Sequence, residues 1–157
     1  MNFIGTTGRI AASFAVVAIL SAVTTGAAKA DTQVAQVKTA AGQAEIVRNG
    51  GHAAAKVGDP LFEKDTIETG TDGSIGITFI DNTVMSSGPN SEIMLEDYKF
   101  NSSDYKGSMT TDVNKGTVSM ISGDIARSSP DAMKVKTPTA ILGVRGTRFV
   151  IQVNEGR

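Results

Sequence analysis

The histidine, His52, is the first residue to consider for chemistry, because the chain contains no other. It follows the turn-like segment Asn49-Gly50-Gly51, and no cysteine or acidic pair accompanies it. A histidine acts as a base or a metal ligand only together with such partners. The sequence also lacks a Gly-x-Ser-x-Gly elbow, so a Ser-His-Asp enzyme is not supported. We interpret His52 as a surface residue.

Two clusters of acidic residues come next: Asp59, Glu63, Asp65 and Glu68, and then Glu92, Glu96 and Asp97. Paired carboxylates catalyse glycoside hydrolysis when their surroundings separate their pKa values. On a strand, Glu92 and Glu96 share the face opposite Ile93 and Leu95, so we expect both glutamates to face solvent. We interpret the clusters as solvated turns and strand edges. A glycan-acting enzyme that uses Asp65 and Glu92 is the alternative.

Cation and phosphate sites have little support in the sequence. No Asp-x-Asp-x-Asp-Gly loop is present, which leaves only an incidental cation site near Asp59 or Asp72. The segment Gly143-Val144-Arg145-Gly146-Thr147 has glycines but lacks the Gly-Lys-Ser/Thr ending of a P-loop. An anion-binding nest in this segment stays open as an alternative, and no cofactor is implied.

Arg145 is the most informative single residue of that segment. It stands between Val144 and Gly146, between two strand-like pieces, so we expect it to be partly buried. A buried guanidinium needs a carboxylate or several carbonyl partners. We therefore expect an internal ion pair that joins the last strand to an acidic turn, with a contact to a partner or ligand as the alternative.

The residues around Arg145 complete a set of structural or interaction candidates. Thr137 precedes a proline and is disfavoured in helical geometry, which predicts an extended corner there. Gly143 and Gly146 are expected to allow close backbone contact. The candidates are Thr137, Pro138, Gly143, Arg145, Gly146 and Thr147.

The first thirty residues have the layout of a secretory signal peptide. Arg9 precedes an apolar run from Ile10 to Val23, and Ala28-Lys29-Ala30 forms a small-x-small cleavage site. The run is shorter than the roughly 20 residues of a spanning helix, so a membrane anchor is the less favoured reading. We predict cleavage after Ala30, a domain over 31–157, and a periplasmic or secreted protein that is not integral to the membrane once processed.

Composition excludes further classes of function. Residues 1–30 hold two of the 15 basic residues and none of the 16 acidic ones, which leaves 13 basic residues and a net charge of −3 after cleavage. Both signs are spread along the chain, so no nucleic-acid partner is indicated. Without cysteine, the chain has no disulfide, thiol catalysis or Cys-ligated zinc.

Short alternating runs predict an all-β single domain, a β-roll, solenoid or sandwich. The expected strands are Val34–Lys38, Ala44–Arg48, Thr66–Thr69, Ser74–Phe79, Thr83–Ser86, Glu92–Asp97, Gly107–Val113, Thr117–Ile121, Lys134–Thr137 and Arg148–Val153. Asp81-Asn82 predicts a tight hairpin. A weak sequence similarity between Gly58-Asp59 and Gly123-Asp124 suggests stacked coils.

The expected core is Ile46, Val57, Leu61, Ile67, Ile75, Ile77, Phe79, Val84, Ile93, Leu95, Val118, Met120, Ile125, Val135, Ile141, Phe149 and Ile151.

Several segments, in order, resemble the FecR domain. They are Ala40–Ile46, Val57–Gly70, Asp72–Ser74 with Phe79–Thr83, Gly88–Glu92, Lys115–Thr117, and Val135–Ala140 with Gly143–Thr147. The resemblance covers residues 38–153. It implies an all-β periplasmic module and offers no catalytic residues. FecR regulators relay the state of an outer-membrane transporter to a sigma factor through a cytoplasmic segment and a membrane span, where this chain has the predicted signal peptide.

The leading hypothesis is therefore a non-enzymatic exported envelope protein that binds a protein partner or a small ligand. The alternative is a periplasmic sensing component of a cell-surface signalling system that works through a separate membrane partner. Exposed edges of a β-roll could pair with a partner strand in either case.

Overall fold

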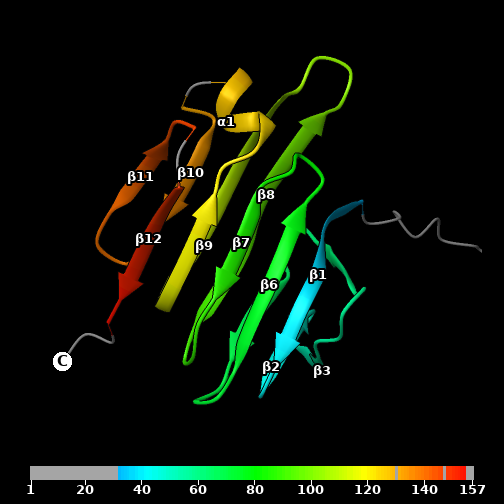
Figure 1. The fold of residues 1–157 in the computed structure, drawn as a ribbon, viewed down its shortest axis with the longest axis vertical. Helices are drawn as coiled ribbons and strands as arrows, with labels where there is room; N and C mark the ends of the chain where they lie inside the picture. The colour runs from blue at the N-terminus through cyan, green and yellow to red at the C-terminus, as the bar shows by residue number, and fades with distance from the viewer. Residues whose placement is uncertain (1–31, 130, 147, 155–157) are drawn as a thin grey trace, which may run out of the picture.

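The computed structural model describes residues 32–129, 131–146 and 148–154, which fold mainly into β-strands (Figure 1). The predicted signal peptide and Thr147 lie outside these residues. The strands are β1 Gln33–Ala41, β2 Ala44–Arg48, β3 Gly51–Ala54, β4 Pro60–Phe62, β5 Thr66–Thr69, β6 Ser74–Phe79, β7 Val84–Ser87, β8 Glu92–Asn101, β9 Lys106–Ile121, β10 Met133–Lys136, β11 Ile141–Val144 and β12 Arg148–Val153. The described residues contain one helix, α1 Asp124–Ser128. The all-β prediction is confirmed.

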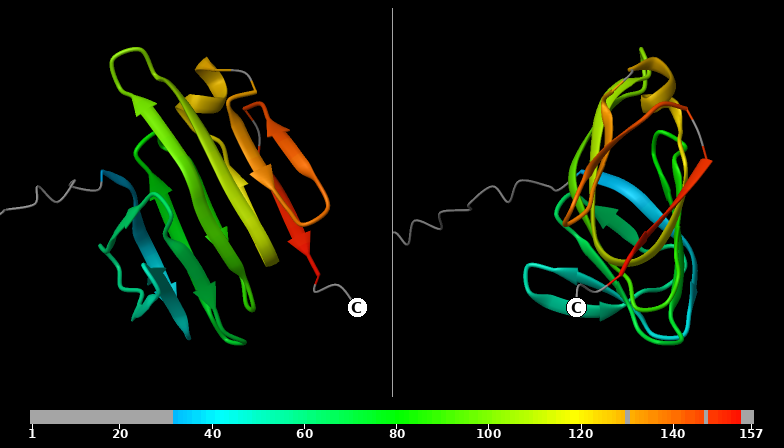
Figure 2. Two further views of the ribbon diagram at one scale, coloured as in Figure 1. Left: turned by 180° about the vertical axis from the view of Figure 1, so that it is seen from behind. Right: turned by 90° about the vertical axis from the view of Figure 1, so that its left-hand side faces the viewer.

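The strands form one sheet that curls so that its two halves face each other (Figure 2). The front layer has the order β4-β1-β6-β7-β9-β12, and the back layer has the order β3-β2-β5-β8-β9-β10-β11. Neighbouring strands are antiparallel except β9 and β10, which are parallel. This curled sheet is a β-roll, one of the all-β architectures that the sequence predicts alongside a solenoid and a sandwich.

Strand β9 belongs to both layers. Residues up to Lys115 pair with β8 in the back layer, and residues from Gly116 pair with β12 in the front layer. Gly116 has φ +94°, and a Cβ on it would lie 2.1 Å from Ser91 Oγ, so only glycine fits this bend. The two separate strands predicted for this stretch are wrong, because the chain changes layer at Gly116 without leaving the sheet.

The hairpin predicted at Asp81-Asn82 is confirmed between β6 and β7. Asn82 has φ +64°, and its backbone N–H donates to Phe79 O at 3.1 Å. The Asp81 carboxylate is buried and accepts hydrogen bonds from the Thr83 N–H and hydroxyl and from the Tyr98 hydroxyl. Burial and the Asp81 charge both raise the pKa of Tyr98, so this tyrosine stays protonated.

The hydrophobic core lies between the two layers and includes most of the predicted residues. Three predictions are wrong, because Val57, Val84 and Ile141 are exposed. Val84 fails because the alternation on β7 has the opposite phase, with Met85 facing the core. Ile141 begins the edge strand β11, and Phe149 is only partly buried.

The segments missed by sequence reasoning are short: β3, β4, β11 and α1. Strand β3 has the sequence Gly-His-Ala-Ala and is exposed throughout, so it carries no alternating pattern. The Gly-Asp similarity does not mark a structural repeat, since Gly58-Asp59 precedes strand β4 and Gly123-Asp124 begins helix α1.

Candidate binding surfaces

Arg145 pairs with an acidic turn, as predicted, but on the surface. Its Nε and Nη2 atoms donate to the two carboxylate oxygens of Asp131 at 3.2 and 2.9 Å. Both side chains are 69% exposed, so the expected burial is wrong. The hydrogen bond and charge of Arg145 lower the pKa of Asp131, and Asp131 raises the pKa of Arg145 in return.

The glycines beside Arg145 make no close backbone contacts. A Cβ on Gly143 would meet only Asp131 Oδ1, at 4.0 Å, and a Cβ on Gly146 would meet nothing within 4 Å. The expected close approach is therefore wrong. Gly146 has φ +51°, which explains a glycine there by conformation instead.

The Thr137-Pro138 corner is the turn of the β10–β11 hairpin. Thr137 N–H donates to Ala140 O at 2.8 Å, and Ala140 N–H donates back to the Thr137 hydroxyl at 3.0 Å. Together with Leu142 and the end of β12, Thr137 and Pro138 line a cavity of about 390 Å³. Of the sequence-predicted candidates that the structure describes, Thr137 and Pro138 line this cavity, whereas Gly143, Arg145 and Gly146 do not.

This end of the roll is open, and we call β11 and β12 the open edge. Strand β11 pairs only with β10, and β12 pairs only with β9, among the residues that the structure describes. The apolar side chains Ile141, Leu142 and Val150 on these strands are 67%, 41% and 65% exposed. Unpaired edges with apolar side chains are sites where another strand can add.

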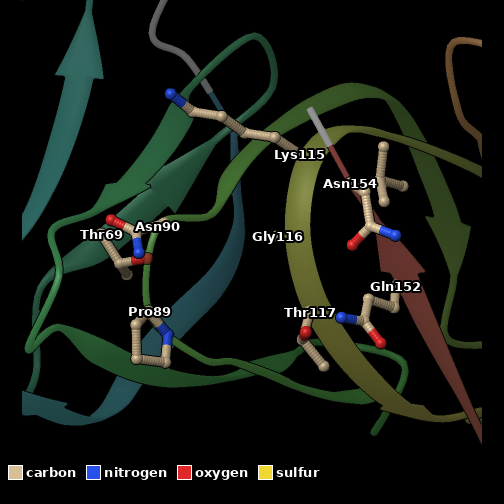
Figure 3. A pocket seen from close by; sticks show the side chains of 9 residues that line it. Thr69, Pro89, Asn90, Lys115, Gly116, Thr117, Gln152 and Asn154 are labelled. Carbon is tan, nitrogen blue, oxygen red and sulfur yellow. The ribbon is translucent and has the colours of Figure 1, made fainter. Parts of the chain in front are cut away.

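A second cavity, the bend notch, lies where β9 changes layer (Figure 3). Its volume is about 560 Å³, and it shares the last residues of β12 with the first cavity. It is lined by Thr69, Pro89, Asn90, Lys115, Gly116, Thr117, Gln152, Val153 and Asn154. Asn90 and Thr69 lie on one side of β9, and Gln152 and Asn154 lie on the other.

Hydrogen bonds fix the β7–β8 turn against the bend of β9. The Thr69 hydroxyl donates to Gly88 O at 2.7 Å and accepts from Ser91 N–H at 2.9 Å. The Ser91 hydroxyl donates to Gly88 O at 2.9 Å and accepts from Thr117 N–H at 3.2 Å. These bonds hold one wall and the floor of the bend notch in place before any ligand arrives.

The first acidic cluster is not uniformly solvated, because Asp65 is buried. Its side chain is 1% exposed and accepts from Arg48 Nε and Nη2, both at 2.7 Å, and from Phe62 N–H at 2.8 Å. The Arg48 guanidinium also lies 4.4 Å from the centre of the Phe62 ring, a cation–π contact. The partly buried arginine–aspartate pair that is expected at Arg145 is found here, with Arg48 40% exposed and Asp65 buried.

The second acidic cluster lies on the solvent side of the back layer in ion pairs. Both carboxylate oxygens of Glu96 accept from Lys136 Nζ, at 3.0 and 2.8 Å, and Glu92 lies 3.9 Å from Lys115. The Glu96 hydrogen bonds raise the pKa of Lys136.

His52 is exposed, and its Nδ1 atom lies 3.3 Å from Glu45 Oε2. Nowhere in the described ranges do three acidic or histidine side chains gather as a metal site would require.

Sequence reasoning missed the bend notch because its residues come from distant segments. Asn90 belongs to a Gly-Pro-Asn-Ser turn that the sequence does mark, and its φ of +52° fits that turn. Gln152 and Asn154 carry no local signal, since only the β9–β12 register brings them to Gly116 and Thr117.

The fold and these surfaces define a class: a β-roll with an open edge and a polar notch. A model of the FecR protein family matches residues 65–157, more than half of the chain, so the chain belongs to the FecR family. No curated protein matches the chain, and no solved structure does either. FecR family membership indicates a signalling-related module, and the family is typically periplasmic. Helix α1, the one helix described, is far too short to cross a bilayer.

Proposed function

We propose that the protein is a non-catalytic, exported envelope module that binds a protein partner along its open edge. The observation that carries this proposal is that β11 and β12 each pair with another strand on one side only, among the described residues, and expose Ile141, Leu142 and Val150. A partner strand that pairs with either edge gains main-chain hydrogen bonds, and the apolar side chains beside it add contact area.

The chemistry of the acidic residues agrees with a non-catalytic role. Asp65 is held by Arg48, and Glu92 accepts from the Asn114 side chain at 2.9 Å and faces Lys115. Neither Asp65 nor Glu92 lines either of the two cavities described above, whereas the two carboxylates of a glycoside hydrolase flank one substrate. Binding therefore explains the described surfaces better than a glycan-acting enzyme does.

Capture of partners from periplasmic extract tests the proposal. Wild-type protein and three variants, Ile141→Lys, Val150→Lys and Val57→Lys, serve as baits. Val57 is 67% exposed, as Ile141 is, but lies between β3 and β4, so it is the matched control. We expect one partner to be recovered by wild type and Val57→Lys and lost by the edge variants, because lysine on an edge strand opposes pairing.

Equal recovery by all four baits would place binding away from the open edge, and recovery of no specific partner would contradict the proposal.

A sensing role in a signalling system is the second candidate function, favoured by FecR family membership. Its distinguishing result is recovery of a membrane-spanning regulator in the same experiment.

A further inference from the structure

The bend notch has hydrogen-bonding groups that the protein itself does not use. The side chains of Asn90, Thr117, Gln152 and Asn154 line it and make no hydrogen bond to another described residue. Each carboxamide offers both N–H donors and a carbonyl acceptor, and the Thr117 hydroxyl offers both as well. Such a set is matched by a ligand whose groups also donate and accept, above all a hydroxyl.

Charge in the notch argues against an ionic ligand. Among the residues that the structure describes, no acidic side chain lines it, and a calcium site would need carboxylates. Lys115, the one cationic residue within the described part of the lining, lies 3.9 Å from Glu92, and its ammonium group is directed away from Gln152 and Asn154 (Figure 3). An anion would therefore meet an already neutralised charge. The lining selects a neutral, polar molecule.

Size and rigidity suit a small ligand. The volume of about 560 Å³ lies within the range of small-molecule sites, roughly 300–1,000 Å³. The hydrogen bonds among Thr69, Gly88, Ser91 and Thr117 fix one wall and the floor, so binding orders few groups. The described lining residues include no aromatic ring, which makes weak, hydrogen-bonded binding the expectation.

We propose that the bend notch binds a segment of a neutral glycan. Its hydroxyl groups bridge Asn90 on one side of β9 to Gln152 and Asn154 on the other, above Gly116 and Thr117. This site adjoins the open edge, since Gln152 lies on β12, but its polar groups line the notch, whereas the proposed protein binding uses the apolar side chains of Ile141, Leu142 and Val150.

The test is an NMR titration of the ¹⁵N-labelled protein with two uncharged probes, chitotriose and maltotriose. We expect at least one probe, at millimolar concentration, to shift the side-chain amides of Asn90, Gln152 and Asn154 and the backbone amide of Gly116. The double variant Gln152→Ala/Asn154→Ala should weaken that binding by about tenfold or more, because each lost partner leaves a ligand hydroxyl unpaired.

Gln36→Ala is the matched control, since it removes a carboxamide from β1, far from β9 in the front layer. It should leave the shifts unchanged, and the same spectra report whether each variant is folded. The proposal is overturned if neither glycan shifts the notch amides, if the double variant binds as wild type does, or if inorganic phosphate shifts them more strongly than both glycans. Loss of partner capture by Val150→Lys with retained glycan binding would separate the two sites.

Discussion

Two arginine–aspartate pairs lie toward opposite ends of the back layer and differ in their surroundings. In each pair the arginine donates through Nε and Nη2 to both carboxylate oxygens. Asp65 beside Arg48 is 1% exposed, whereas Asp131 and Arg145 are both 69% exposed. The same bidentate geometry therefore occurs once with a desolvated carboxylate and once in water.

The difference shows which end of the roll is fixed by polar contacts. Asp65 also accepts from Phe62 N–H through its side chain, and its backbone carbonyl accepts from Leu95 N–H at 2.9 Å. One residue thus connects β2, β4 and β8. Within the described residues Asp131 has no comparable set of partners, and its pair with Arg145 is screened by solvent and salt. We infer that the first pair holds the fold and the second leaves the open edge accessible.

The largest expected effect comes from removing the buried carboxylate. Asp65→Ala leaves the Phe62 N–H and the Arg48 guanidinium without their acceptor, and we expect the free energy of unfolding to fall by about 3 kcal/mol. Urea denaturation followed by circular dichroism measures this loss. A loss under about 1 kcal/mol would show that burial does not distinguish the two pairs.

Arg48→Lys should have an intermediate effect on stability. Lysine keeps the positive charge but loses the two-pronged geometry and most of the contact with the Phe62 ring. We expect a loss of about 1–2 kcal/mol in the same denaturation experiment. Arg145→Lys is the matched control, and an equal loss in both variants would contradict the proposed difference.

Arg145→Ala should have almost no effect on stability. The sequence alone predicts that this substitution lowers stability more than it alters surface binding, because it predicts a partly buried guanidinium, but the exposed pair gives no reason for a marked loss. We expect the thermal midpoint to change by less than about 2 °C. Differential scanning calorimetry measures the midpoint. A decrease as large as that of Asp65→Ala in the same experiment would support the internal ion pair that the sequence predicts.

The smallest expected effect is on the free energy of unfolding at low pH. Arg145 lowers the pKa of Asp131 below its ordinary value of 3.8, so the folded state binds this proton less readily than the unfolded state. The contribution is present above pH 3.8 and is lost as the pH falls through the lowered pKa. An NMR titration of the Asp131 carboxyl carbon should show the pKa rising in Arg145→Ala. An unchanged pKa would mean that the pair does not form in solution.

Local patterns were enough to predict strands whose residues alternate or are β-branched. The bounds of β2, β5, β6 and β12 agree with the predicted ranges, because each has its own apolar alternation. The sequence predicts two strands where β9 is continuous, because Asn114-Lys115-Gly116 resembles a turn. The contacts that keep this stretch in the sheet, Lys115 with Glu92 and Gly116 with Ser91, join residues that are distant in sequence.

The candidate sites were harder to predict, because burial depends on neighbours that are distant in sequence. Val144 and Gly146 suggest a partly buried Arg145, but β11 is an edge strand, and no described strand pairs with its outer side. Asp65 looked like one acid among several, yet the β5–β8 pairing and Arg48 enclose it. The FecR resemblance identified the family correctly but named no site residues.

The continuous strand β9 has a consequence for how the protein unfolds. Strands β7, β8, β10 and β12 all take hydrogen bonds from it, so neither layer can open fully while the other stays intact. Amide protons in both layers should then exchange with solvent through one shared opening event, and the two layers form a single cooperative unit. A partner that adds a strand to β12 would slow exchange as far away as β8, which links occupancy of the edge to the rigidity of the whole roll.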